Sequence, residues 1–331
     1  MTRTSIPRRA ALVAGLAAAA TVALPARRAL AAYPERSIRW IVAYAAGGGT
    51  DTLARTLGAT MSPKLGQPVV IENRPGGATN IGAEAAARSA PDGYTVFSAD
   101  NGTLVFNPAL FRKLPYDPDR DFRPIGLLAR FPLVLTAKQD SAFNSAREFL
   151  DGGKAKPGQI DYGSAGVGSP HHLAMERLSK ETGTRFNHVP YRGAAPALND
   201  LLAGTIEAMV VDLVSGASHL RSGRVKPLAI FSAARHPDLP NVPTVQEAFG
   251  LTGFEAYAWQ ALMAPARTPD AVAARLTEEL AVVLRDDAVK DRMRTLGFEP
   301  LSGGPAEFRT LIEAERAIWV QLTRERGITL E

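Results

Sequence analysis

The sequence predicts an α/β fold of two lobes, each a mostly parallel β-sheet flanked by helices, with a ligand cleft between the lobes. Apolar runs of strand length alternate with helical patterns, which is typical of βαβ units. The alternation starts again near residue 160, so the second half repeats the architecture of the first. With 331 residues and a hydrophobic content of 46%, the chain is long enough for two domains with sizeable cores.

Residues 1–32 have the pattern of an export signal. Arg3, Arg8 and Arg9 precede a short apolar region at 10–25, and the small residues at 29–31 predict cleavage near Ala31 or Ala32. Arg8-Arg9 is a twin-arginine pair, so export of the folded chain and the general secretory route both stay open. The chain has no cysteine, which excludes disulfides and a lipid anchor on cysteine. No apolar run after this segment is long enough to predict a transmembrane helix.

The excess positive charge of the chain belongs to this N-terminal segment. The full sequence has 38 Lys and Arg against 33 Asp and Glu, a net charge of +5. Residues 1–32 contain five arginines and no acid, so the remainder has 38 − 5 = 33 basic and 33 acidic residues. A neutral chain lacks the basic surface of nucleic-acid-binding domains, and we expect no nucleic-acid partner.

The first half predicts three strands, each with a loop at its carboxyl end. Residues 38–44 form a strand that leads through Gly47, Gly48 and Gly49 into a helix opening at Thr50-Asp51, with Thr50 as its N-cap. The further elements are a helix to about residue 64, a strand at 68–72, a turn at 73–77, a helix at 80–89, a strand at 94–99 and a loop at 100–103.

The second half predicts the same arrangement. An apolar extended stretch at 125–137 could run between the lobes, and a helix at 145–154 follows it. The strands are expected at 160–162, 186–189, 206–211 and 225–230, with loops at 163–169, 190–193 and 212–216. The C-terminal part is helical, with Thr268 capping one helix and Pro305 starting the last. We expect residues 33–134 with 253–331 to form lobe 1 and residues 135–252 to form lobe 2.

The predicted loops are suited to binding an anion. Ligands of open α/β sheets bind at the carboxyl ends of the strands, and helix N-termini after glycine-rich turns offer free N–H groups. Thr50, Thr103, Ser164 and Ser169 supply hydroxyl donors, although turn and capping roles would also explain them. Nucleotide motifs do not fit, because the third Rossmann glycine and the P-loop lysine are both missing.

The sequence contains no recognisable catalytic or metal-binding constellation. His171 and His172 are adjacent, and adjacent positions on a helix point about 100° apart, so they chelate a metal poorly. We expect His172 to line the cleft and His171 to be solvated; a polar helix N-terminus would explain both. Asp212 ends an apolar strand and either meets the ligand or caps the next helix. We expect no metal, no cofactor and no catalytic residue.

Several segments, in order, resemble the extracytoplasmic solute receptors of tripartite tricarboxylate transporters, also called Bug-type receptors. They lie at 43–51, 72–76 with 80–82, 91–95, 116–122, 163–169 with 172–173, 189–193 and 239–247. The sequence departs from the family pattern at Ala45-Ala46, where prolines are common, at Ala78-Thr79, where glycines are common, and at Arg192, where lysine is frequent.

The resemblance implies a type II-like periplasmic binding protein that closes its lobes on a small carboxylate and delivers it to integral membrane transporter subunits. The family's ligands are dicarboxylates, tricarboxylates, acidic amino acids and aromatic carboxylates. A monomer in the periplasm is expected. A receptor that signals through a membrane partner, or a hydrolase or lyase on the same scaffold, remains an alternative. The predicted ligand-binding residues are Tyr44, Gly48, Thr50, Asp51, Asn101, Thr103, Ser164, Ala165, Gly166, Ser169, His172, Tyr191 and Asp212.

Overall fold

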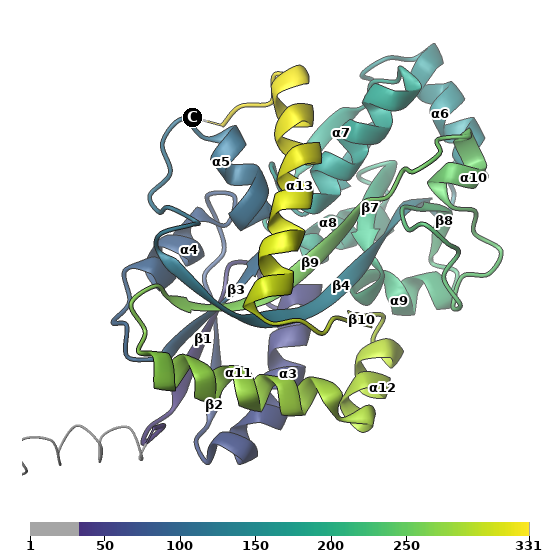
Figure 1. Cartoon of the computed structure of the whole chain (residues 1–331). Coiled ribbons are helices and arrows are strands. Elements are labelled where there is room, and N and C mark those ends of the chain that lie inside the picture. Colours follow the sequence, from purple (N-terminus) through teal and green to yellow (C-terminus); the bar gives the residue numbers. More distant parts are fainter. Residues whose placement is uncertain (1–32, 331) are drawn as a thin grey trace, which may run out of the picture.

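The computed structural model describes residues 33–330, and the export signal predicted for residues 1–32 lies outside them. Two groups of strands, each with helices packed against it, meet along two long strands in the middle of the molecule (Figure 1). Within residues 33–330 the ten strands follow the order β2-β1-β3-β9-β4-β7-β5-β6, with β8 and β10 also pairing with β4. No helix in this part of the chain is long and apolar enough to cross a membrane.

The first half is a three-stranded parallel sheet with β1 at its centre. Trp40, Ile41 and Val42 of β1 are fully buried, as expected for a parallel strand covered on both faces. Helix α3 ends at Gly66, whose left-handed conformation closes its last turn. The elements are β1 (Ile38–Val42), α3 (Gly49–Leu65), β2 (Val69–Asn73), α4 (Asn80–Ala87), β3 (Thr95–Asp100), η1 (Gly102–Phe106) and α5 (Asn107–Leu110).

The second half repeats this arrangement around β5, which lies between the parallel strands β6 and β7. Helices α7, α8 and α9 each begin at the carboxyl end of one of these strands. The elements are α6 (Ala146–Ala155), β5 (Asp161–Ser164), α7 (Pro170–Thr182), β6 (Asn187–Pro190), α8 (Ala194–Ala203), β7 (Ala208–Asp212), α9 (Leu213–Arg221), β8 (Val225–Ile230) and α10 (Val245–Phe249).

Strand β4 (Phe122–Lys138) belongs to both halves. Its first part, as far as Pro132, pairs with β9 (Tyr257–Pro265), and its second part, from Leu133, pairs with β7 and β8. This change of partners lies beside the lobe boundary that the sequence predicts. The chain ends in α11 (Asp270–Arg285), α12 (Asp287–Thr295), β10 (Glu299–Pro300) and α13 (Pro305–Glu325), and α13 crosses in front of β4 and β9 (Figure 1).

Three local predictions were wrong. Helix α3 begins at Gly49 with the extended Gly48 as its N-cap, and Thr50 instead accepts a hydrogen bond from Gln260 through its hydroxyl. The loop expected at 100–103 continues into the π-helix η1, whose residues are all buried. Thr268 donates its hydroxyl to the carbonyl of Pro265, which leaves Pro269 at the N-cap of α11. The sheets are also less parallel than predicted, because β4, β8, β9 and β10 all pair antiparallel.

Candidate functional site

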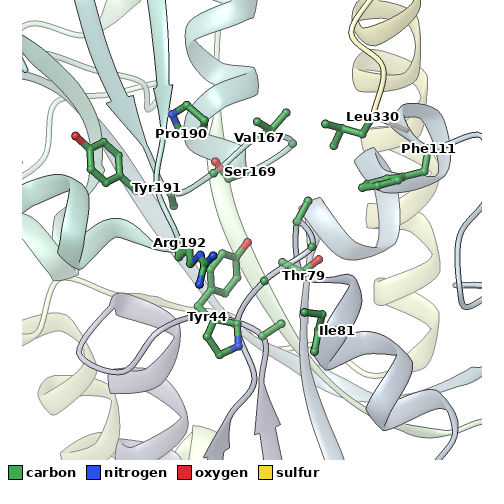
Figure 2. A pocket seen from close by; sticks show the side chains of 18 residues that line it. Tyr44, Thr79, Ile81, Phe111, Val167, Ser169, Pro190, Tyr191, Arg192 and Leu330 are labelled. Atoms are coloured by element: carbon green, nitrogen blue, oxygen red, sulfur yellow. The ribbon is translucent and has the colours of Figure 1, made fainter.

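Two neighbouring cavities lie where the carboxyl ends of the strands of both halves meet. The larger has a volume of about 530 Å³ and is lined from both halves of the chain (Figure 2). The smaller, of about 30 Å³, shares Tyr44 and Ala165 with it. The larger cavity is lined by Ala43, Tyr44, Pro75, Gly76, Gly77, Ala78, Thr79, Ile81, Phe111, Ala165, Gly166, Val167, Gly168, Ser169, Pro190, Tyr191, Arg192 and Leu330.

The loop between β1 and α3 is braced by the buried carboxylate of Asp51. This carboxylate accepts hydrogen bonds from the backbone N–H of Gly47 (3.0 Å), from Nε of Arg55 (2.9 Å) and from Nδ2 of Asn73 (3.0 Å). Burial alone would raise the pKa of Asp51, but the bonds from Arg55, Gly47 and Asn73 outweigh it and lower the pKa. Asp51 therefore fixes the shape of the glycine loop, and it lines neither cavity.

The loop between β2 and α4 has four consecutive residues with positive φ. Gly76 and Gly77 take values of 117° and 57°, and Ala78 and Thr79 continue at 50° and 75°. This region costs a residue other than glycine about 1–2 kcal/mol. The structure holds it through Asn107, which donates from Nδ2 to the carbonyl of Ala78 (2.7 Å). Within residues 33–330 the backbone N–H groups of Ala78 and Thr79 donate no hydrogen bond, so both remain available at the cavity wall.

Thr103 supports this loop from behind. Its hydroxyl donates to Oδ1 of Asp100 (2.7 Å) and lies 3.0 Å from the hydroxyl of Thr79. Asn101 is fully buried and donates from Nδ2 to the carbonyl of Tyr257 (2.9 Å). Neither Thr103 nor Asn101 lines a cavity, because both side chains are buried and bonded inside the protein.

The loop at 164–169, between β5 and α7, presents backbone to the larger cavity. Gly166 (φ 130°) and Gly168 (φ 74°) adopt conformations that favour glycine. A Cβ on Gly166 would lie 2.9 Å from the carbonyl oxygen of Tyr191. Ser169 caps α7, because its Oγ accepts the N–H of His172 (3.3 Å), and Ser169 itself lines the larger cavity.

The side chains of Ser164, the first residue of this loop, and of His172 in α7 bond the backbone of the loop from its buried side. Oγ of Ser164 accepts the N–H of Gly166 (3.1 Å), and Nδ1 of His172 accepts the N–H of Gly168 (3.2 Å). Oγ of Ser164 also lies 2.6 Å from Nε2 of His188, a residue that the sequence reasoning missed. Neither Ser164 nor His172 lines a cavity, and both act on the backbone that does.

The smaller cavity has several hydrogen-bonded polar side chains in a largely apolar wall. Tyr44 donates its hydroxyl to Oδ2 of Asp100 at 2.5 Å, and Thr50 accepts from Nε2 of Gln260 at 3.0 Å. Oε1 of Gln260 is buried and finds no partner within residues 33–330. Across the cleft, the N–H of Gly49 donates to Oγ of Ser215 (3.1 Å), which joins the two halves at this point.

Asp212 both caps a helix and lines the smaller cavity. Its Oδ1 accepts the N–H of Ser215 (2.8 Å) at the start of α9, and its Oδ2 lies 3.4 Å from Nε2 of His171. Burial would raise the pKa of Asp212, but His171 and Ser215 outweigh it and lower the pKa, so the carboxylate is charged at neutral pH. The expectation that His171 is solvated was wrong, because its side chain packs against Asp212 and is 7% exposed.

The structure brings together eight of the thirteen predicted residues at the cavities: Tyr44, Gly48, Thr50, Ala165, Gly166, Ser169, Tyr191 and Asp212. The other five lie behind them: Asp51, Asn101, Thr103, Ser164 and His172.

The sequence did not indicate Phe111 and Leu330, which meet in a β-bridge at the cavity wall although one follows α5 and the other follows α13. Arg192 is the one charged side chain among the described residues that line the larger cavity, and within residues 33–330 it forms no ion pair. Residues 33–330 contain no cluster of three or more side chains that could hold a metal ion.

Comparison with known proteins agrees with this geometry. Residues 53–328 match the family described as tripartite tricarboxylate transporter family receptor. The protein Rpa4515 of R. palustris, solved with adipate, is 34% identical with a TM-score of 0.86, over 90% of this chain and 99% of that one. The periplasmic binding protein BugD is 34% identical with a TM-score of 0.85, over 90% and 100% of the two chains.

A third solved structure extends the range of bound solutes. MatC (Rpa3494) of Rhodopseudomonas palustris, solved with malate, is 34% identical with a TM-score of 0.81, over 88% of this chain and 99% of that one. These likenesses confirm the predicted α/β periplasmic binding protein fold and the predicted family. The chain therefore belongs to the TctC, or Bug, family of periplasmic solute-binding receptors, which bind solutes and are not enzymes.

Proposed function

We propose that this receptor captures a small carboxylate in the periplasm and delivers it to the integral membrane subunits of a tripartite tricarboxylate-type transporter. The observation that carries the proposal is the convergence of helix N-termini at the two cavities. Gly48 and Thr50 come from the start of α3, Ser169 from α7 and Gly193 from α8. Free N–H groups and the positive end of the helix dipole favour an anion at such a position.

The wall of the larger cavity narrows the class of carboxylate. Ile81, Phe111, Val167 and Leu330 form an apolar side, and Arg192 provides a cation near Tyr44 (Figure 2). A volume of about 530 Å³ falls within the range of small-molecule sites, roughly 300–1,000 Å³. These features fit a carboxylate that carries a hydrocarbon chain or ring better than a compact ion with several charges. The relatives solved with adipate and malate support a dicarboxylate as the ligand. An aromatic carboxylate also fits an apolar wall with one cation.

Capture requires the two halves to move relative to each other. We assign residues 33–134 with 253–331 to one lobe and 135–252 to the other, joined through β4 and the segment before β9. Contacts across the cleft, such as Gly49 to Ser215, would form as the lobes close and would seal the ligand from water. We expect the receptor to act as a monomer.

A thermal-shift screen of carboxylates tests this proposal. Adipate, malate, an acidic amino acid and benzoate cover the classes, and at least one should raise the melting temperature. With that ligand at saturation, X-ray scattering should give a smaller radius of gyration than for the free protein. If none of the carboxylates binds, the proposed ligand class is wrong; if binding is clear but the radius is unchanged, lobe closure is wrong.

Export can be tested separately. Because residues 1–32 have basic, apolar and small-residue regions in the order of a signal peptide, the mature chain should begin at Ala32 or Tyr33. The intact mass of protein recovered from the periplasm decides the point. A periplasmic species that retains Arg8-Arg9 would contradict this prediction.

A further inference from the structure

Two imidazole rings hold the ligand-facing loop at 164–169 from its buried side. His172 accepts the N–H of Gly168 at Nδ1 (3.2 Å), near one end of the loop. His188 contacts the hydroxyl of Ser164 through Nε2 (2.6 Å), at the other end, and that hydroxyl accepts the N–H of Gly166. The two glycines with positive φ are therefore each tied, directly or through Ser164, to a histidine.

The two rings also lie against each other. Their centroids are 4.0 Å apart with an angle of 11° between the planes, and Tyr162 stacks on His188 at 5.0 Å. His172 is buried, and His188 is half-buried on β6. The pair thus forms a packed support that joins α7, where His172 lies, to β6 and to the loop between β5 and α7.

The charged and titratable groups around the pair are few. Glu176 lies one turn along α7, with Oε1 3.9 Å from Nε2 of His172 and 3.5 Å from the hydroxyl of Tyr162. Arg326, after α13, binds Glu176 through two nitrogens, at 2.9 and 3.0 Å. Because this arginine already neutralises Glu176, the carboxylate stabilises a protonated imidazole only weakly.

The hydrogen bonds define the form that His172 must take. A ring nitrogen that accepts an N–H carries no proton, so neutral His172 has its proton on Nε2. A second proton on Nδ1 would set two donors against each other, Nδ1–H and the N–H of Gly168. It would also place a positive ring on the face of His188 in a site with little access to water.

We propose that His172 and His188 are positioning residues that, as a stacked neutral pair, hold the loop at 164–169 in the shape that binds the carboxylate. Neither ring touches the cavity; each acts through the backbone of the loop. This inference rests on the proposed function for its consequence in binding, whereas the loop geometry it describes can be measured without a ligand.

The pair makes the loop sensitive to acid. Burial lowers the pKa of His172 to about 4. Burial and then the neighbouring His172 lower the pKa of His188 to about 3. Unfolded histidines protonate near 6.5, so the unfolded chain binds more protons between that pH and about 4. The stability that the neutral pair contributes is therefore fully present above pH 6.5 and falls as the pH drops towards 4. The loop should lose its shape over the lower part of that range.

The test compares two replacements of His172 that differ in one acceptor. Asparagine can place its Oδ1 where Nδ1 lies and still accept the N–H of Gly168, whereas leucine cannot. In His172→Leu, amide hydrogen exchange of Gly168 at pH 7 should be about tenfold faster, as expected for the loss of one hydrogen bond. His172→Asn should stay within about threefold of wild type at pH 7 and should respond less to acid between pH 6.5 and 4, because only His188 of the pair remains.

A surface histidine gives the matched control. His236 also accepts a backbone N–H at Nδ1, from Asp238 (3.2 Å), in a loop away from the cavities. His236→Leu should leave the exchange of Gly168 unchanged. In wild type, ¹⁵N spectra of histidine should show His172 neutral, with its proton on Nε2, down to about pH 5. If His172→Leu does not fold, this titration and the comparison of His188→Gln with wild type still decide the question.

Two results would overturn the inference. One is a His172 that titrates near 6.5 or carries its proton on Nδ1, and the other is unchanged exchange of Gly168 in folded His172→Leu. Adipate binding by calorimetry then links the loop to function, with affinity at least about tenfold weaker in His172→Leu and restored in His172→Asn. If wild type ignores adipate and the other screened carboxylates while the exchange results hold, the proposed function fails and the positioning role stands.

Discussion

Replacing Gly166 by valine should abolish carboxylate binding. Gly166 has a φ of 130°, which β-branched residues do not adopt without strain, and its new Cβ would lie 2.9 Å from the carbonyl oxygen of Tyr191. The obstacle is backbone rather than a flexible side chain, so the loop at 164–169 must change shape. Because this loop forms part of the wall of the proposed ligand site, the change would remove the contacts that it makes there.

A melting assay measures this loss. A ligand at 100 times its Kd stabilises the folded protein by roughly 2.7 kcal/mol, which shifts the melting temperature by several degrees. Gly166→Val should melt lower than wild type without ligand, because backbone strain of this kind costs about 1–3 kcal/mol, and it should show no rise with ligand. Gly204 is the matched control: it has a φ of 77° at the end of α8, and nothing lies within 4 Å of a Cβ there. Gly204→Val should melt lower and keep the ligand-induced rise.

Salt tests the same mode of binding by a second route. Apart from Arg192, the larger cavity presents no charged side chain among the described residues, so the proposed function requires short-range N–H and O–H donors to hold the anion. Affinity should then fall only modestly between low and physiological salt, since screening acts mainly on long-range charge. A steep salt dependence together with ligand binding by Gly166→Val would mean that Arg192 is the main anchor.

Asp212→Asn should change which carboxylate the receptor prefers. The charged carboxylate of Asp212 opposes a second negative group at the smaller cavity and favours a ligand amine there. Asparagine removes the charge but keeps an oxygen for the N–H of Ser215, and aspartate and asparagine cap helices about equally well. Calorimetry should show that the affinity for a dicarboxylate, relative to that for an acidic amino acid, is about tenfold higher in Asp212→Asn than in wild type. This ratio corresponds to roughly 1.4 kcal/mol.

Asp286 separates the charge effect from the capping effect. It caps α12 by accepting the N–H groups of Ala288 and Val289, and it is exposed. Asp286→Asn should therefore lose as much stability from weaker capping as Asp212→Asn does. It should not change which ligand the receptor prefers. If Asp212→Asn loses about 1 kcal/mol of stability and the order of ligands does not change, Asp212 is a helix cap only.

The parts of the site that follow from local chemistry were predictable. Glycines at 47–49 after an apolar strand predict an open loop and a helix start, and the structure has β1 and α3 there. Gly166 and Gly168, with Ser169 before a helical run, predict a loop with positive φ and a capped helix, and both are present. Such signals lie within about ten residues, where backbone sterics and capping decide the outcome.

The parts that depend on tertiary contacts were not predictable. Ala78 and Thr79 disfavour positive φ, and hydrogen bonds from Asn107 and Thr103 help to hold them there. Asn107 lies in α5, and Thr103 lies in a π-helix that no local pattern indicates. His188 is one residue of a strand until the fold stacks it on His172. Asp212 illustrates the limit: the sequence offers a cap or a ligand contact, and the packed structure places one carboxylate where it can do both.

The position of Leu330 determines how this receptor should be engineered. Its N–H donates to the carbonyl of Leu110 (2.7 Å), and its side chain lies at the wall of the larger cavity beside Phe111 (Figure 2). A reporter group attached at this position would therefore lie at that wall. Because the chain has no cysteine of its own, an environment-sensitive dye on a cysteine introduced at Leu330 would report on what occupies that cavity.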